Sequence, residues 1–79
     1  MQNTFTWRNG ILKTNNLRIQ ITRNHIHARG EWVMHVREFG WETKRLNIPN
    51  DSTIEVAQST AVHQVRSHLI SMKDDLNGL

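Results

Sequence analysis

The chain lacks cysteine, contains a single proline, and has no apolar run longer than a few residues. Without cysteine it can form no disulfide bond, thiolate nucleophile or zinc–thiolate site. No run is long enough to cross a bilayer, and the N-terminus lacks the charged and apolar regions of a signal peptide. The sequence therefore predicts a cytoplasmic protein with no membrane contact, and its 79 residues (1–79) correspond to a single domain.

Positive charge is concentrated before Pro49, the main boundary in the chain. Residues 1–50 hold eight Lys and Arg against three Glu, a net charge of +5, and residues 51–79 hold two basic against four acidic residues, a net charge of −2. A one-sided basic surface is typical of proteins with an anionic partner, most often nucleic acid. Because charge also serves solubility, the composition leaves a purely solubilising role open.

A C-terminal helix is the clearest predicted element. Segment 52–55 (STIE) is a capping box in which Ser52 is the N-cap, and Gly78 is a plausible C-terminal cap. Between these caps, apolar residues recur in steps of three or four: Ile54, Ala57, Ala61, Val65, Leu69, Met72 and Leu76. This period predicts an amphipathic helix over 52–77.

Upstream of the helix, the apolar period changes to two, which is typical of strands. Segments 17–22 and 32–38 alternate between apolar and polar residues, and 41–48 is expected to form a further strand. These segments make up a sheet over 16–49. The predicted fold is α+β, with an antiparallel sheet of three to five strands packed against one long C-terminal helix.

Turn signals divide the strands. Asn9-Gly10 lies between the apolar segments 4–8 and 11–13, so residues 1–15 are expected to form an N-terminal hairpin with a type I′ turn. A two-residue turn is expected at Arg29-Gly30. The alternation slips between Ile21 and Ile26, where either a turn at 23–24 or a bulge would restore it.

Alternation also assigns side chains to the two faces of the sheet. Trp32, Met34 and Val36 of one strand are expected to face the helix. Leu46 and Ile48 of the next strand complete this apolar cover, and their burial stabilises the docked helix. The other face of the sheet is then left open.

The open face is the first candidate site. An antiparallel sheet can enter the DNA major groove, where Arg recognises guanine, and an aromatic, basic face can stack on unpaired bases. The expected nucleic-acid-binding residues are Arg18, Arg29, His35, Arg37, Trp41, Thr43 and Arg45. An ordinary solvated sheet face would carry the same residue types, so the pattern alone does not separate the two interpretations.

Neither metal binding nor catalysis is predicted. The expected two-residue turn pairs His27 with Trp32. It also pairs His25 with Met34, so His35 faces the other side of the sheet and completes no three-histidine site. The two histidines of the helix lie on different sides of it. The carboxylates and hydroxyls form no metalloprotease, nucleophile-elbow or P-loop motif, and we expect no catalytic residue, metal or cofactor.

The helix end is the second candidate site. A strand of about six residues spans about 20 Å, whereas the predicted helix spans about 37 Å. The last turns should therefore extend past the sheet and expose Met72 and Leu76, which could bind a partner protein or form a homodimer. Alternatively, the N-terminal hairpin could fold over this end with Phe5, Trp7 and Ile11.

Three segments carry a resemblance to known DNA-binding domains. They are Gly30 to Arg37 (GEWVMHVR), Lys44 to Leu46 (KRL) and Ser52 to Ala57 (STIEVA). In this order they resemble the arm-binding N-terminal domain of phage-type tyrosine integrases and the plant ethylene-response (apetala-type) domain. The resemblance covers about residues 17–70 and implies a sheet in the major groove, with Trp32 as an anchor and Arg37 and Arg45 as basic residues of the sheet face. The chain differs from these families in its longer helix, its N-terminal hairpin and its three glutamates.

These features predict a small non-enzymatic protein that binds duplex DNA through a basic sheet face, such as an accessory or regulatory factor of a phage or mobile element. The alternative is a protein-interaction module, such as an inhibitor or adaptor, that uses a sheet edge or the overhanging helix. The acidic residues near the basic ones favour this alternative, because dedicated DNA-binding domains are usually more basic.

Overall fold

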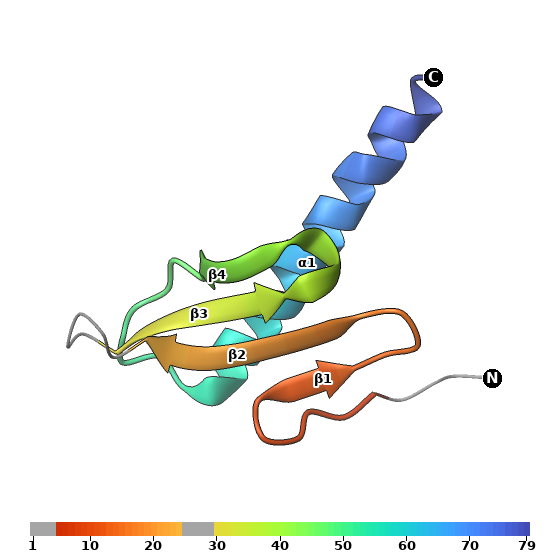
Figure 1. Cartoon of the computed structure of the whole chain (residues 1–79). Helices are drawn as coiled ribbons and strands as arrows, with labels where there is room; N and C mark the ends of the chain where they lie inside the picture. Colours follow the sequence, from red (N-terminus) through yellow and green to blue (C-terminus); the bar gives the residue numbers. More distant parts are fainter. Residues whose placement is uncertain (1–4, 25–29) are drawn as a thin grey trace.

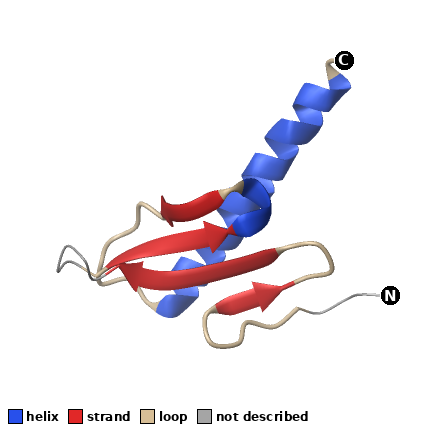
Figure 2. Ribbon diagram, viewed as in Figure 1, coloured by secondary structure: helices blue, strands red, loops and turns tan. Residues whose placement is uncertain are grey.

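The computed structural model of the protein describes residues 5–24 and 30–79 (Figure 1). Four strands form one antiparallel sheet in the order of the chain, and one long helix follows them (Figure 2). The elements are β1 (Ile11–Lys13), β2 (Arg18–Asn24), β3 (Glu31–Val36), the 3-10 turn η1 (Arg37–Phe39), β4 (Trp41–Arg45) and α1 (Ile54–Asn77). The predicted α+β arrangement is confirmed.

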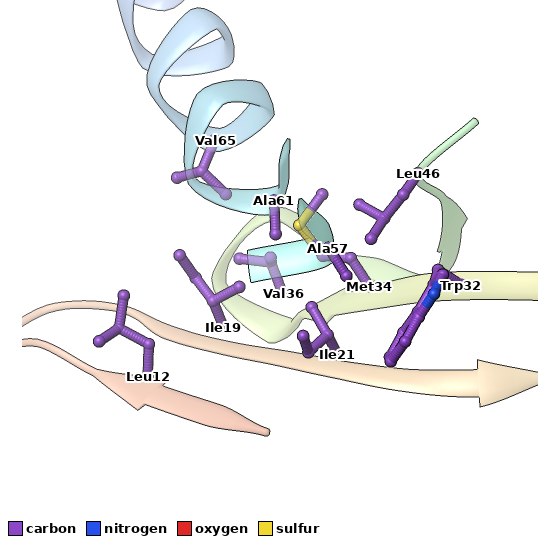
Figure 3. Close-up of a cluster of buried hydrophobic side chains, with 10 residues drawn as sticks. All are labelled: Leu12, Ile19, Ile21, Trp32, Met34, Val36, Leu46, Ala57, Ala61 and Val65. Atoms are coloured by element: carbon purple, nitrogen blue, oxygen red, sulfur yellow. The ribbon is translucent and has the colours of Figure 1, made fainter. Parts of the chain in front are cut away.

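Helix α1 packs against one face of the sheet, the covered face, and no described element covers the other, the outer face (Figure 1). The core lies between the helix and the covered face (Figure 3). It consists of Leu12, Ile19, Ile21, Trp32, Met34, Val36, Leu46, Ala57, Ala61 and Val65. Ala57 and Ala61 are fully buried, and their small side chains let the helix approach the strands closely.

The alternation predicted the covered face of β3 correctly. Trp32, Met34 and Val36 are buried, and Leu46, just after β4, is buried with them. Ile48 is half-buried against this core. Burying each such side chain contributes about 1.5–3 kcal/mol, so these residues provide much of the stabilisation that docks the helix.

The expected turn at Asn9-Gly10 is present. Both residues have positive φ, 52° and 74°, and Arg8 and Ile11 exchange two backbone hydrogen bonds of 2.9 Å across the turn. The strand expected before this turn is not formed in the described residues 5–7, and its only pairing there is the bridge between Arg8 and Ile11. β1 instead pairs along β2, with Leu12 opposite Ile19.

The register between β2 and β3 corrects the expected two-residue turn. Trp32 pairs with Arg23 rather than with His27, and Met34 pairs with Ile21 rather than with His25. β2 also continues to Asn24, so the turn considered at 23–24 is wrong. Arg29 and both of these histidines lie outside the described residues.

A basic residue in a covered position explains this error. Arg23 pairs with Trp32, so its side chain lies on the covered face although its charge suggests a solvent position. Its guanidinium donates hydrogen bonds to the carbonyl oxygens of Gly30 (2.9 Å) and Asn50 (2.7 Å). These bonds compensate the charge at the rim of the core and extend β2 further than the apolar pattern indicates.

β4 contains a bulge that the sequence did not reveal. Val36 pairs with Trp41, but Met34 pairs with Lys44, so two residues of β4, Glu42 and Thr43, stand opposite one residue of β3. The extra residue reverses the alternation. Trp41, expected on the outer face, therefore lies on the same face as Val36. The expected strand 32–38 also ends at Val36, because η1 follows.

The helix begins one residue later than the predicted cap. Thr53 is the N-cap, and its hydroxyl accepts a 3.3 Å hydrogen bond from the Val56 N–H. Ser52 is instead held by its backbone, because its carbonyl accepts from Trp32 Nε1 (3.1 Å) and its N–H donates to Pro49 (3.0 Å). Gly78 is the C-cap, in a right-handed helical conformation. The described helix is not apolar enough to cross a membrane.

Candidate interaction surfaces

Pairing defines the residues of the outer face. Directly paired residues share a face, so the residues paired with β3 positions 33 and 35 extend the outer face onto β2 and β4. The outer-face residues are Ile11, Lys13, Arg18, Gln20, Thr22, Glu31, Val33, His35 and Arg45. Arg18, His35 and Arg45 were expected on this face. Arg45 lies there because it pairs with Val33, beyond the bulge that turns Trp41 to the covered face.

An open hollow lies where the outer face meets η1. It is lined by Gln20, His35, Arg37, Gly40, Trp41 and Glu42. The structure thus brings together three residues of the predicted nucleic-acid site, His35, Arg37 and Trp41. Thr43 is exposed in the adjoining bulge.

The imidazole of His35 is engaged inside the domain. Its Nδ1 contacts the main-chain oxygen of Glu42, and its Nε2 lies 3.1 Å from the Thr22 hydroxyl. A carbonyl oxygen can only accept, so Nδ1 carries a proton and donates it to this bond. His35 therefore fixes the bulge to β3 and β2, and neither ring nitrogen is left for a ligand.

Trp41 is also engaged. Its ring lies 4.9 Å from that of Phe39 and 4.8 Å from that of His68, centroid to centroid, and Lys44 Nζ lies 4.7 Å from its centroid. Phe39 and His68 complete the cluster at 4.6 Å. The indole therefore closes the end of the docked part of α1 and offers little free surface on which a base could stack. Sequence reasoning missed His68, although it lies three residues after the buried Val65 on the docked side of the helix.

Acidic groups interrupt the positive charge of the outer face. Five cationic side chains lie on or beside it: Arg8, Lys13, Arg18, Arg37 and Arg45. Arg45 forms a 3.4 Å ion pair with Glu31, and Glu38 accepts a 2.6 Å hydrogen bond from the backbone N–H of Arg18. Glu42 lines the hollow. With five cations against three carboxylates, the predicted basic face keeps only a small excess of positive charge.

The end of α1 extends beyond the sheet, as expected from its length (Figure 1). Every residue from Leu69 onward is exposed, including Met72 at 45% and Leu76 at 68%. The N-terminal hairpin does not cover this end in the described residues. Trp7 instead lies beside Glu55 and Val62, along the docked half of the helix.

Four of these exposed residues form a continuous stripe. Leu69, Met72, Leu76 and Leu79 follow one another in steps of three, four and three, the spacing of core positions in a coiled coil. The first three lie in α1, and Leu79 directly follows the C-cap, Gly78. We call these four residues the seam. At 3.6 residues per turn, the three helical residues of the seam lie on the same side of α1 as the buried Ala57, Ala61 and Val65, so the seam continues the docked face past the edge of the sheet.

Within residues 5–24 and 30–79, no group of three or more His, Asp and Glu side chains could hold a metal ion.

No protein-family model, curated protein or solved structure matches this chain. The resemblance to integrase and ethylene-response domains therefore stays a prediction.

Proposed function

We propose that this chain is a non-enzymatic protein-interaction module whose binding surface is the seam of α1. The observation that carries this proposal is the run of exposed apolar residues at coiled-coil spacing on a helix segment that its own sheet does not reach. Contiguous exposed apolar surface of this kind typically marks an interaction site. An amphipathic helix commonly binds by placing such a stripe against a partner's apolar surface.

The docked half of α1 holds the seam in a fixed direction. Gln64 Nε2 donates a 3.0 Å hydrogen bond to the carbonyl of Leu46, and Trp32 Nε1 anchors the turn before the helix at Ser52. Ala57 and Ala61 are tightly packed between these two points. These contacts anchor the docked half of α1 and so fix the direction in which the seam leaves the domain.

The edges of the sheet are poorer interaction surfaces. β1 is three residues long, and β4 is interrupted by the bulge at Glu42 and Thr43. Short edge strands, bulges and charged edge residues are the features that prevent pairing with another chain. Of the two surfaces expected for a protein-interaction module, the helix overhang is therefore the better supported.

Site-specific crosslinking tests this function. A photo-reactive amino acid in place of Met72 should give a discrete protein adduct in cells that produce the chain, because position 72 lies in the middle of the seam. The same group in place of Asp74, on the opposite side of the helix, is the matched control and should give none. The Met72 adduct should disappear when Leu76→Glu is added. Equal adducts from both positions, or none from Met72, would contradict the proposal.

Nucleic-acid binding by the outer face is a second candidate. It is supported by the hollow, which places Arg37 beside His35 at the end of an uncovered antiparallel sheet, and by the further cations Arg18 and Arg45. The double variant Arg37→Ala, Arg45→Ala should then lose a gel shift of duplex DNA at about 50 mM salt while keeping its fold. If the unsubstituted chain gives no shift, this candidate is excluded. It ranks second because Glu31 pairs with Arg45 and the ring of Trp41 is largely covered.

A further inference from the structure

The spacing of the seam and the position of the sheet indicate which partner fits. We infer that the partner is a second copy of this chain, whose α1 lies antiparallel to the first along the seam. This inference rests on the proposed function of the seam as an interaction surface, and it adds the identity and orientation of the partner.

The sheet restricts how two copies can meet. It packs against the same side of α1 that carries the seam, so a parallel partner helix would run into the sheet along Ala57, Ala61 and Val65. In an antiparallel arrangement only the exposed ends, 69–79, overlap, and each docked half points away from the other copy. The described fold therefore allows a dimer through the seam in the antiparallel orientation.

The seam is self-complementary in this orientation. With the overlap centred on residue 74, Leu69 of one copy lies opposite Leu79 of the other, the residue that directly follows the C-cap of its helix. Met72 lies opposite Leu76, and the two-fold axis repeats both contacts. In heptad terms Leu69 and Leu76 are a positions, and Met72 and Leu79 are d positions. Each contact therefore joins an a position of one copy to a d position of the other, as in an antiparallel coiled coil. Ile70 lies off the seam and takes no part in this contact.

Only two turns or so of each helix overlap, so the interface is small. Interfaces below about 1,200 Å² in total are typical of weak, transient association. The last turn of α1, which the structure describes in full, carries no basic side chain, and Asp74 and Asp75 lie near the negative end of the helix. The isolated end should therefore fray, and association should increase the helix content.

Concentration-dependent mass measurement tests the dimer. By sedimentation velocity from about 1 µM to about 1 mM, the full chain should shift from monomer to dimer, with a parallel gain in helical circular dichroism. Leu76→Glu should weaken the dimer at least about tenfold, because both copies lose the contact. Ile70→Glu is the matched control, with the same new charge at an exposed apolar position, and should dimerise like the unsubstituted chain.

Charge exchange at Lys73 tests the orientation. In the antiparallel pair the flank that carries Lys73 faces the same flank of the other copy, so the two lysines lie near each other and repel. A mixture of the unsubstituted chain with Lys73→Glu should therefore form a heterodimer about two- to fivefold tighter than the average of the two homodimers. In a parallel pair Lys73 would face His68 instead, and no heterodimer preference would follow.

The antiparallel dimer and the interaction function of the seam can fail separately. A monomer at every concentration, equal loss of the dimer in Leu76→Glu and Ile70→Glu, or no heterodimer preference would overturn the antiparallel dimer. If the chain is monomeric and the crosslinker at Met72 captures a different protein, the interaction function stands without self-association. If no adduct forms at Met72 either, both are wrong.

Discussion

The guanidinium carbon of Arg23 lies 4.2 Å from the ring centroid of Trp32, so a cation from β2 covers the largest aromatic side chain of β3. The same guanidinium bonds to the backbone of Gly30 and Asn50, on either side of the sheet segment β3–β4. This contact joins the rim of the core to the turn that precedes α1. The other covered positions in the described part of β2, Ile19 and Ile21, are apolar, whereas position 23 is an arginine.

Replacing this arginine should therefore destabilise the domain. Arg23→Ala removes the cation–π contact and three charge-assisted hydrogen bonds, the third to the carbonyl of Ser52, and we expect a loss of about 1–2 kcal/mol in the free energy of unfolding, measured in urea. Arg23→Lys should recover only part of this, because a lysine cannot donate in the same fork geometry. Arg45→Ala is the control, since its exposed ion pair should contribute less than about 1 kcal/mol. Equal losses at both positions would contradict the role assigned to Arg23.

Gly10 and Gly40 provide a matched pair of backbone substitutions. Both have positive φ, 74° and 71°, but a Cβ at Gly10 would lie 2.9 Å from the carbonyl oxygen of Ile21, whereas a Cβ at Gly40 would meet nothing within 4 Å. Both Gly→Ala variants should lose about 1 kcal/mol or more from backbone strain. Gly10→Ala should lose more, because β1 must also move away from β2. Thermal unfolding of the two variants measures the difference, and an equal loss would show that the close approach is relieved at no cost.

The helix start gives a third prediction. Thr53→Ala removes the side chain that caps α1 and should cost about 1 kcal/mol in the free energy of unfolding. Ser52→Ala should be close to neutral, because the contacts of Ser52 are made by its backbone. Urea unfolding of the two variants distinguishes them. A larger loss in Ser52→Ala would restore the capping box that the sequence predicts.

The helix and the covered face could be predicted because their residues repeat with a clear period. The stripe from Ala57 to Val65 and the alternation from Trp32 to Val36 each identify a buried face without further information. The overhang also followed from the sequence, because the lengths of a helix and a strand depend only on their residue numbers. Exposure of Met72 and Leu76 was therefore predictable before any contact was known.

The bulge and the charge pairing could not be predicted in this way. Glu42 and Thr43 are both polar, so alternation cannot show that both stand opposite His35. Trp41 was consequently assigned to the wrong face. The ion pair between Arg45 and Glu31 depends on strand register, which composition does not report. The sequence thus suggested a strongly basic outer face, whereas acidic groups offset much of its positive charge.

The division of α1 into a docked half and a projecting half implies that one continuous helix has two stabilities. The amide of Ala61, packed on the sheet, should exchange its hydrogen only when the whole domain unfolds. The amide of Asp74 lies on about 13 Å of helix beyond the last aromatic contact and should exchange by local opening alone. The rate of hydrogen exchange along α1 should therefore rise steeply after His68. Binding of a partner to the exposed end would move this step toward the C-terminus.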